Sequence, residues 1–538
     1  MSIHSSTELS LSADVLVIGG GPAAAWAAYG AARAGAKVVV VDKGYLGASG
    51  SAAASGNGVW TVPPDERDAE IEDRWRSGAG LADRRWIARV LDVTWRSMPL
   101  IESFGYAFPT VEGEPVRASY YGPEYMRVLR KQLRRMQVTI LDQSPALELL
   151  VADDGSVAGA RGVRRQEHRF YEVRAGAVVL ATGGCAFLSR ALGSNVNTGD
   201  AFLMAVEAGA ELSGMEFSAQ YAISSALNAT VTRGVPYGWA TFYDGDGHPL
   251  EASEGGRRSG TLLADALLRG PVYARLDKAT EEVRRVIEKS HFIAFLPLRK
   301  AGIDPYTQRF PVTLVLEGTV RGSGGVRIVA DDCAATVPGL YAAGDAASRE
   351  LLAGAASGGG GPNAAWTIAS GQWSGEGAAR FAATLGPHAH ARRVQRTGSV
   401  GITPRSDAPY DADAIIQGVQ GELFPLDKNF YRSERGLTAS LATLDALWDA
   451  LRAGPRHGST RDVERGRIAA ALTATARWAY RSGLARRETR NLQRRRDHPS
   501  RDPAQCHHLI SGGLDDVYVR AAPATDAGHF AAALEVAS

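Results

Sequence analysis

The chain has 538 residues, which is too long for one domain and fits two to four. Hydrophobic residues make up 45% and charged residues 22%, as in an ordinary soluble globular protein. With 60 basic and 58 acidic residues the formal net charge is +2, so bulk charge predicts no attraction to nucleic acid or to a membrane surface.

The sequence predicts no membrane span, no secretory signal and no cysteine cluster. No run of about 18 or more apolar residues could span a bilayer, and residues 1–14 lack the basic and apolar regions of a secretory signal. Cys185, Cys333 and Cys506 are isolated, so they suit a reducing cytoplasm and cannot ligate an iron–sulfur cluster by themselves. We therefore expect a cytoplasmic protein, and any such cluster must lie on another chain.

The first predicted element is a strand followed by a glycine-rich turn and a helix. Residues 15–18 are an apolar run typical of a buried parallel strand, and residues 23–34 are a helical stretch of mostly small residues. In the pattern GxGxxG/A, Gly19 allows the tight turn, Gly21 lets the backbone approach a pyrophosphate, and Ala24 lets helix and strand pack closely. The helix N-terminus then presents N–H groups and a partial positive charge to phosphates.

A second strand supports this interpretation. Residues 38–41 are all valine and end at Asp42, whose carboxylate can accept hydrogen bonds from ribose hydroxyls. A bare glycine pattern is weak evidence, but strand, helix, second strand and acid in this order indicate a dinucleotide site.

The middle of the chain continues the α/β pattern. Residues 177–182 form a strand that ends in Gly183 and Gly184, a turn that can pass under a bound dinucleotide. Residues 197–200, NTGD, are typical of a helix cap before the amphipathic stretch 201–208.

A second glycine-rich segment follows roughly 300 residues after the first. It reads GLYAAGD at 339–345 and is followed by glycines at 358–361. A plain NAD dehydrogenase usually needs only the first segment, whereas a flavoprotein that holds FAD along its whole length uses both. The two segments together therefore predict FAD.

The order of the motifs resembles that of a known family. Along the chain stand DVLVIGGGPAAAWAA, VVVVDK, VVLATGG, NTGDAFLMAVEAGAELSGMEF, GLYAAGD and ETRNLQRRRDHPSRD. In this order they resemble the fumarate reductase/succinate dehydrogenase flavoprotein superfamily, which includes L-aspartate oxidase and the adenylylsulfate reductase flavoprotein subunit. The resemblance runs from about residue 12 to about residue 510, with departures that mark a divergent member.

The resemblance implies an α/β fold with three parts. A Rossmann-like FAD-binding domain of the glutathione-reductase type would cover 8–225 and 323–400, with an inserted α+β capping domain at 226–322. Residues 401–434 would be a linker, and 435–538 a C-terminal helical domain.

The resemblance also implies which residues contact FAD. Asp42 would bind the adenosine half, and Asp345 the ribitol chain. Family members that bind FAD covalently use a histidine in the segment corresponding to 47–58, where this chain has none, so we expect dissociable FAD. The expected contacts are Gly19, Gly21, Pro22, Ala23, Asp42, Lys43, Ser49, Gly50, Ser51, Thr182, Gly183, Gly184, Asp200, Gly344, Asp345, Gly361 and Asn363.

Where dicarboxylate-processing members hold their substrate, this chain departs from the family pattern. Tyr221 takes the place of a histidine after the MEF motif. Pro236 takes the place of the arginine that donates a proton, although a loop shift could bring Arg233 to that position.

Two further anchors differ. Val320 and Arg321 replace a His-Tyr pair, and the position of a substrate-binding arginine falls at Gly358 or Gly359. A pair of carboxylates would then lack its bidentate arginine clamps. Succinate, fumarate and aspartate are therefore poor substrate candidates.

Three side chains near the expected flavin are candidates for catalysis. Tyr221 would donate or accept a proton near flavin N5, or is a core tyrosine with a satisfied hydroxyl. Arg321 and Arg349 would hold a substrate anion or the negative charge of reduced flavin, or form surface ion pairs. The glycines within 354–361 make room for a larger or flatter substrate, or only permit close backbone approach to FAD.

The cap and the C-terminus leave similar choices open. Trp239, Phe242 and Tyr243 line an aromatic wall or belong to an ordinary cap core, and His291 is more often solvent-exposed than functional. Residues 481–501 contain eight arginines, but without interleaved aromatics they do not indicate nucleic-acid binding. We expect structural ion pairing with the FAD domain, or a subunit contact.

The favoured function is a self-contained FAD dehydrogenase or oxidase that takes a hydride from a small polar molecule onto flavin N5. The alternative is the flavoprotein subunit of an adenylylsulfate-reductase-like complex, with an iron–sulfur or ferredoxin-type electron partner. A non-catalytic flavin-binding protein is a third reading, and a homo-oligomer stays open.

Overall fold

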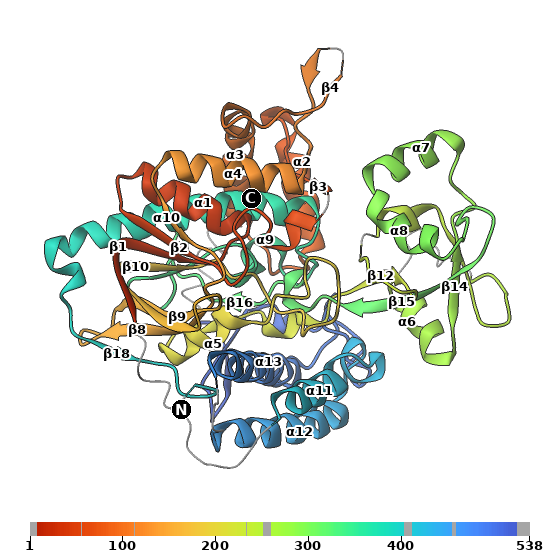
Figure 1. Ribbon diagram of the computed structural model, residues 1–538. Helices are drawn as coiled ribbons and strands as arrows, with labels where there is room; N and C mark the ends of the chain where they lie inside the picture. Colours follow the sequence, from red (N-terminus) through yellow and green to blue (C-terminus); the bar gives the residue numbers. More distant parts are fainter. Residues whose placement is uncertain are drawn as a thin grey trace, which may run out of the picture.

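An eight-stranded sheet lies at the centre of the main body (Figure 1). The computed structural model describes residues 8–54, 56–111, 113–232, 234–250, 260–402, 411–454 and 459–523. The strand order is β18-β8-β9-β10-β1-β2-β7, and β17 pairs with β10. These strands are β1 (Leu9–Ile18), β2 (Val38–Val41), β7 (Thr139–Leu141), β8 (Ala146–Ala152), β9 (Val157–Arg164), β10 (Arg169–Leu180), β17 (Leu340–Ala342) and β18 (Val394–Arg396).

The parallel strands of this sheet are apolar because helices cover both of its faces. β1 pairs in parallel with β2 and β10, and β10 pairs in parallel with β17. Val15 and Val17 pack into one cluster of buried residues, while Leu16 and Ile18 pack into the other. The first face carries α1 (Pro22–Arg33), α4 (Gly122–Arg135) and α10 (Gly361–Thr384), and the second carries α5 (Asp200–Glu207) and α13 (Thr460–Ala485) (Figure 1).

The elements expected in this region are present, with one difference at a helix start. The strand predicted at 38–41 is β2, and those predicted at 15–18 and 177–182 are the ends of β1 and β10. The N-cap of α5 is Gly199 in a left-handed conformation (φ +78°), and no side chain caps this helix. Thr198 and Asp200 instead bind Lys43.

Small residues allow α1 and α10 to cross at close range. A Cβ at Gly371 would lie 2.7 Å from the carbonyl oxygen of Ala23, and a Cβ at Gly375 would overlap the carbonyl oxygen of Ala27. Both helices begin at the cavity described below.

A second unit projects from the main body and is joined to it by β12 and β15 (Figure 1). Its antiparallel sheet has the order β12-β15-β14-β13. The capping segment was expected at 226–322. In the structure it starts at Tyr221, because all of β12 (Tyr221–Ser225) pairs with β15. The elements are β12 (Tyr221–Ser225), β13 (Thr241–Tyr243), β14 (Val272–Arg275), β15 (Phe310–Leu316), α6 (Gly260–Arg269), α7 (Glu281–Ser290) and α8 (Phe292–Lys300).

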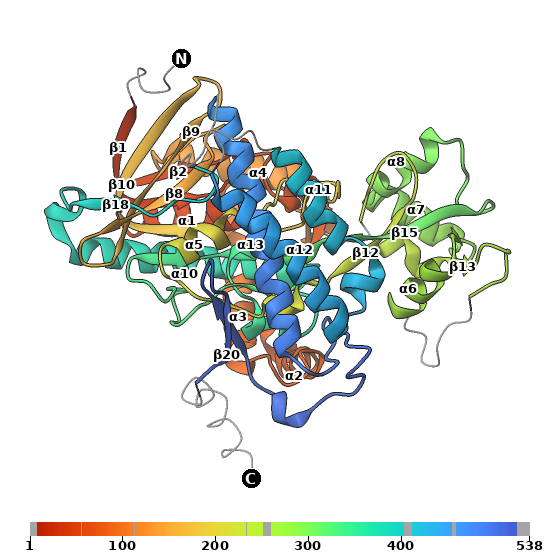
Figure 2. The same ribbon diagram turned by 90° about the horizontal axis from the view of Figure 1, so that it is seen from below.

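The C-terminal part contains long helices and a small sheet (Figure 2). α11 (Ala412–Leu423), α12 (Glu434–Arg452) and α13 pack on one another. Residues 401–434 are therefore more than a linker, because α11 buries Ile415 and Val419; residues 403–410 lie outside the described residues. Nor is 435–538 all helical, since β19 (Leu509–Gly512) and β20 (Tyr518–Ala521) extend a sheet with β11 (Leu212–Ser213) and β16 (Gly325–Val326).

The remaining helices and strands lie outside the sheets described above (Figure 1). They are α2 (Arg67–Ser77), α3 (Arg84–Ser103), α9 (Glu350–Ala353), β3 (Gly56–Gly58), β4 (Thr110–Val111), β5 (Glu114–Pro115) and β6 (Ser119–Tyr121). Among the helices of the described ranges, none has both the length and the apolar character needed to cross a bilayer.

Candidate active site

A cavity of about 690 Å³ lies where the carboxyl ends of the parallel strands face the capping unit. Ile18 and Val41 line it at the ends of β1 and β2, and Ala181 lines it just after β10. Both glycine-rich segments also line it, through Gly19 and Gly344. The two segments that predicted one dinucleotide site therefore share one cavity.

The first glycine segment forms a tight turn under the cavity. Gly19 has φ +131°, and a Cβ there would overlap the carbonyl oxygen of Ala181. Gly21 is the N-cap of α1 and has an extended backbone, and Pro22 follows within the first turn. The N-cap of α1 thus carries no side chain where a phosphate would approach the N–H groups of the helix.

The second glycine segment touches the first turn of α1. Gly344 has φ +61°, and a Cβ there would lie 2.6 Å from the Cβ of Ala23. Any larger residue at this position would push the two segments apart. The backbone cradle fits the pyrophosphate of FAD.

Polar side chains converge at the end of β2. Ser49 Oγ donates a short hydrogen bond to Asp42 Oδ2, and burial raises the pKa of Asp42 although this hydrogen bond opposes the rise. Lys43 Nζ donates to Thr198 Oγ1 and to Asp200 Oδ2, each at 2.8 Å. Four of these five residues were expected from the sequence, and Thr198 was not.

Charged residues from α13 and from the turn after β9 also reach this end of the cavity. Arg165 Nε lies 2.9 Å from Glu464 Oε2, and the Arg467 guanidinium pairs with Glu207. Arg165, Glu464 and Arg467 line the cavity. Sequence reasoning missed them because 299 positions separate Arg165 from Glu464 and no local motif joins them.

A buried arginine orients the expected ribitol-binding residue. Arg349 Nη1 donates to Asp345 Oδ1 at 2.6 Å and to Asn363 Oδ1 at a shorter distance. Burial raises the pKa of Asp345, and the Arg349 guanidinium opposes the rise. Asp345 and Asn363 line the cavity, whereas Arg349 is fully buried behind them and does not. The expectation that Arg349 contacts substrate or flavin is therefore wrong, and Arg349 is a positioning residue.

Most of the expected FAD contacts line the cavity, and two do not. A Cβ at Gly184 would lie 2.6 Å from Thr319 Oγ1, so Gly184 packs against the protein rather than the cavity. The Gly361 carbonyl accepts a hydrogen bond from Trp60 N at 3.2 Å, while the adjacent Gly360 faces the cavity. The lining residues among those expected are Gly19, Gly21, Pro22, Ala23, Asp42, Lys43, Ser49, Gly50, Ser51, Thr182, Gly183, Asp200, Gly344, Asp345 and Asn363.

At the cap-facing end, a carboxylate and an arginine lie together. Glu317 directly follows β15, and its side chain is 1% exposed. Thr232 Oγ1 donates to Glu317 Oε1 at 2.7 Å, and Arg321 Nε lies 2.8 Å from Glu317 Oε2. His291, which lies between α7 and α8, is partly exposed and also lines this cavity. Glu317 was not identified from the sequence because it lies outside every motif.

The glycine run does not open space for substrate along its whole length. A Cβ at Gly358 would lie 3.1 Å from Arg349 Nε, and a Cβ at Gly359 would lie 3.0 Å from Arg321 Cδ. Two arginine side chains therefore fill the room that these glycines leave. Gly360 alone of the three has no atom within 4 Å of the point where a Cβ would stand.

Tyr221 lies in the core instead of the active site. Its hydroxyl donates to the Leu423 carbonyl at 2.7 Å, and its ring packs edge-on against Phe430. Burial raises the pKa of Tyr221. It is not among the cavity-lining residues, so the expected catalytic role of Tyr221 is contradicted in favour of the core alternative.

The other expected residues of the cap are accounted for in a similar way. Pro236 is buried outside the cavity, and Arg233 lies outside the described residues. Phe242 belongs to the cap core and Trp239 packs against it, so neither forms a wall of the cavity. Tyr243 stacks under the Arg309 guanidinium, 3.9 Å from Cζ to the ring centroid.

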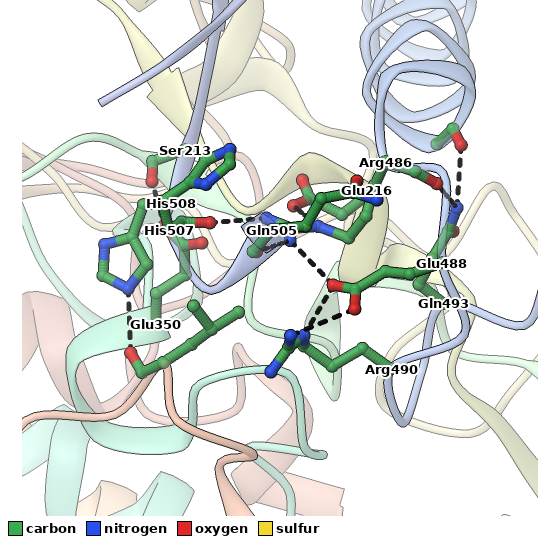
Figure 3. Close-up of polar contacts among 12 residues, drawn as sticks. Ser213, Glu216, Glu350, Arg486, Glu488, Arg490, Gln493, Gln505, His507 and His508 are labelled. Atoms are coloured by element: carbon green, nitrogen blue, oxygen red, sulfur yellow. Dashed lines mark hydrogen bonds and ion pairs between the residues drawn. The ribbon is translucent and has the colours of Figure 1, made fainter. Parts of the chain in front are cut away.

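The C-terminal arginines form a buried ionic network (Figure 3). Arg486 Nε lies 2.7 Å from Glu216 Oε1 and Nη1 lies 3.1 Å from Glu488 Oε1, with all three side chains fully buried. Arg490 Nε also pairs with Glu488, at 2.6 Å. These contacts join the segment after α13 to the FAD-binding part, which confirms the expected structural ion pairing.

Comparisons with known proteins agree with this site. Residues 14–119 and 112–362 match the family model described as FAD binding domain. L-aspartate oxidase of Mycobacterium tuberculosis (strain ATCC 25618 / H37Rv) is 27% identical, over 94% of this chain and 96% of the relative. A fumarate reductase (CoM/CoB) subunit of Methanothermobacter marburgensis is 26% identical, over 91% of this chain and 95% of the relative.

Solved structures show the same fold. Quinol fumarate reductase FrdA of E. coli superimposes with a TM-score of 0.81 at 20% identity, covering 96% of this chain and 97% of that chain. Adenylylsulfate reductase of Archaeoglobus fulgidus superimposes with a TM-score of 0.77 at 18% identity, covering 97% of each chain.

Proposed function

Because the chain belongs to the FAD binding domain family, we propose that this FAD-dependent oxidoreductase oxidises a small polar substrate other than a C4 dicarboxylate. The proposal rests on one observation at the cap-facing end of the cavity. Among the described lining residues there, Arg321 is the one arginine, and it is already paired with Glu317. With the described residues, two carboxylates on one substrate would share one guanidinium that Glu317 already partly neutralises.

The residues of the cavity fit FAD along its length. The bare turn at Gly19 and Gly21 and the start of α1 suit the pyrophosphate, and Asp42 suits the ribose of the adenosine half. Asp345, oriented by Arg349, suits the ribitol chain. We propose that FAD is held without a covalent bond, since residues 47–58 contain no histidine.

Bound FAD supplies the hydride acceptor for the reaction, and the protein supplies the surroundings. Arg321 provides positive charge at the cap-facing end and also acts electrostatically on Asp345. Thr232 and Glu317 fix that arginine, and Thr232, Val235 and His291 of the capping unit also line the cavity. A substrate held there would be oriented and shielded from water.

The alternative is the flavoprotein subunit of a complex with an iron–sulfur partner. The M. marburgensis relative is named as a subunit, which supports this alternative. The three cysteines are free thiols, two buried and one exposed, so a cluster would have to lie on another chain.

Anaerobic bleaching of the flavin absorption tests the proposal. Purified FAD-loaded protein is mixed with amines, hydrazines, hydroxy acids, amino acids and dicarboxylates. Bleaching by a compound outside the dicarboxylates supports the proposal, and bleaching by succinate or aspartate contradicts the exclusion of C4 dicarboxylates. Reduction by dithionite alone would favour the alternative with a partner subunit.

A further inference from the structure

We infer that the cap-facing end of the cavity takes a monocarboxylate with an apolar body, and that Arg321 holds its carboxylate. This inference rests on the proposed function and names the substrate class of the same site: the carboxylate is the polar group of the small substrate, and the rest of the molecule is apolar. Its basis is the placement of Arg321, Glu317 and a set of apolar side chains around one end of the cavity.

The Arg321 guanidinium faces the cavity with its terminal nitrogens uncommitted. Its side chain is 25% exposed, and its ion pair with Glu317 is made through Nε. Within the described ranges, no protein oxygen accepts a hydrogen bond from Nη1 or Nη2 of Arg321. The two terminal nitrogens of an arginine match the two oxygens of a carboxylate.

The protein fixes the direction of this arginine before any ligand arrives. The Arg321 carbonyl accepts hydrogen bonds from Gly358 N and from Ser357 Oγ, both at 3.0 Å. The side chain then passes Gly359, where a Cβ would lie 3.0 Å from Arg321 Cδ. Glu317 is itself held by Thr232, and its backbone N donates to the Gln220 carbonyl at 2.9 Å. Because the Arg321 side chain is already fixed, ligand binding costs little of its conformational entropy.

The charges that the described residues place at this end suit one carboxylate and not two. Glu317 places a negative charge 2.8 Å from Arg321, which already offsets part of its positive charge. The nearby Arg349 is fully buried and donates to the Thr319 and Val320 carbonyls, so it is unavailable as a second clamp. A second carboxylate would have to lose its water among apolar side chains.

Apolar side chains line the cavity beside this charge pair. Leu192, Val196 and Val235 line it and are 41%, 53% and 52% exposed, and Val235 follows Thr232 by three residues. Leu192 N donates to the Thr230 carbonyl at 3.1 Å, two residues before Thr232. An apolar substrate body would cover these side chains.

The loop that carries Leu192 is held in a strained conformation. Phe187, Leu188 and Arg190 have φ angles of +53°, +55° and +64°, which side-chain-bearing residues rarely adopt. Such strain persists where the surroundings determine the backbone, and it clusters at ligand clamps. Leu188 lines the cavity as well.

Benzoate serves as the probe, because it joins one carboxylate to an apolar ring. Full-length FAD-loaded protein is titrated with benzoate or succinate, and the perturbation of the flavin absorption gives each Kd. We expect saturable benzoate binding and weaker succinate binding. Arg321→Gln should weaken benzoate binding roughly 10- to 100-fold, the equivalent of a hydrogen-bonded charge pair.

Two further variants separate this role from a structural one. Glu317→Gln removes the competing negative charge and should tighten benzoate binding, whereas damage to the fold would weaken it. Leu192→Asn should weaken benzoate binding and leave acetate binding unchanged. Arg327→Gln is the matched control, since Arg327 pairs with Glu211 at 2.6 Å outside the cavity and should leave the benzoate Kd as it is.

The inference is overturned if Arg321→Gln binds benzoate like the parent protein, or if succinate binds more tightly than benzoate. Retained FAD absorption and an unchanged thermal midpoint establish that each variant is folded. A dicarboxylate that bleaches the flavin would overturn the proposed function itself. If an amine bleached the flavin and the protein did not bind benzoate, the proposed function would stand and only the inference would be overturned.

Discussion

Arg349 Nη1 donates a 2.6 Å hydrogen bond to Asp345 Oδ1 behind the wall of the cavity. The same guanidinium donates to the carbonyls of Thr319 and Val320, which directly precede Arg321. One buried cation therefore ties the second glycine segment to the turn that presents Arg321. Its role is to orient these groups, since no part of it lines the cavity.

Replacing Asp345 by alanine should abolish FAD retention. The change removes the expected ribitol contact and leaves Arg349 buried without its carboxylate, which typically costs about 3–5 kcal/mol. The flavin-to-protein absorbance ratio after gel filtration measures retention. Asp345→Asn is the milder control, because it keeps an acceptor for Arg349 and should retain more FAD than the alanine variant. Normal FAD occupancy in Asp345→Ala would contradict the role assigned to the second segment.

Gly21→Ala should weaken FAD binding while leaving the FAD-free fold intact. A Cβ at Gly21 would lie 3.6 Å from the Gly50 Cα, an ordinary contact, but it would occupy the approach of the pyrophosphate. Replacing the N-cap glycine by alanine should lower the free energy of unfolding by less than about 1 kcal/mol. FAD titration and the thermal midpoint of the FAD-free protein separate the two effects. Gly270→Ala, with no atom within 4 Å of its Cβ position and outside the cavity lining, is the control and should bind FAD normally.

Tyr221→Phe should leave the rate of flavin reduction unchanged and slightly lower the free energy of unfolding. The lost hydroxyl donates to the Leu423 carbonyl, but Asn429 Nδ2 also donates to that carbonyl at 3.0 Å. The expected cost is therefore about 1 kcal/mol. Urea unfolding and stopped-flow bleaching are the measurements. If the variant reduced its flavin ten times more slowly at equal stability, Tyr221 would have a catalytic role after all.

Asp497→Asn should lower the free energy of unfolding at neutral pH, and the difference from the parent protein should become smaller in acid. Arg495 donates to both carboxylate oxygens at 2.8 Å, and these hydrogen bonds lower the pKa of Asp497 below its ordinary value. A depressed pKa contributes stability above the unfolded value of about 3.9, and this is lost as pH falls toward the folded value. Urea midpoints of parent and variant should therefore converge below about pH 4.

Asp449→Asn provides the comparison, because Asp449 is an exposed aspartate on α12. Its urea midpoint should follow that of the parent protein at every pH. If Asp497→Asn behaved in the same way, the pair with Arg495 would contribute nothing to stability.

Acid precipitation should release the flavin into the supernatant. Residues 47–58 contain no histidine, and free FAD leaves an unfolded chain. Flavin fluorescence of the supernatant and of the washed pellet gives the two fractions. Flavin that stays with the pellet would indicate a covalent bond, and loss of that signal in His291→Ala would identify the cavity-lining histidine as its site.

Local patterns determined the cofactor-binding half of this protein. β1, the turn at Gly19, α1 and β2 follow one another within 25 positions of Gly19, so strand, turn and helix propensities alone place them. The requirement for glycine at Gly19 and Gly344 is likewise local, since both adopt positive φ. For the same reason, most of the expected FAD contacts do line the cavity.

Tertiary packing decided the roles of the remaining side chains. Tyr221 turns toward Leu423, 202 positions away, and Arg349 turns inward because Gly358 leaves it room. The same packing brings Thr232 to Glu317, 85 positions away, which in turn pairs with Arg321 in its own turn. A side chain on a strand or turn takes its direction from what packs against it, and those partners lie too far along the chain for any local pattern to specify.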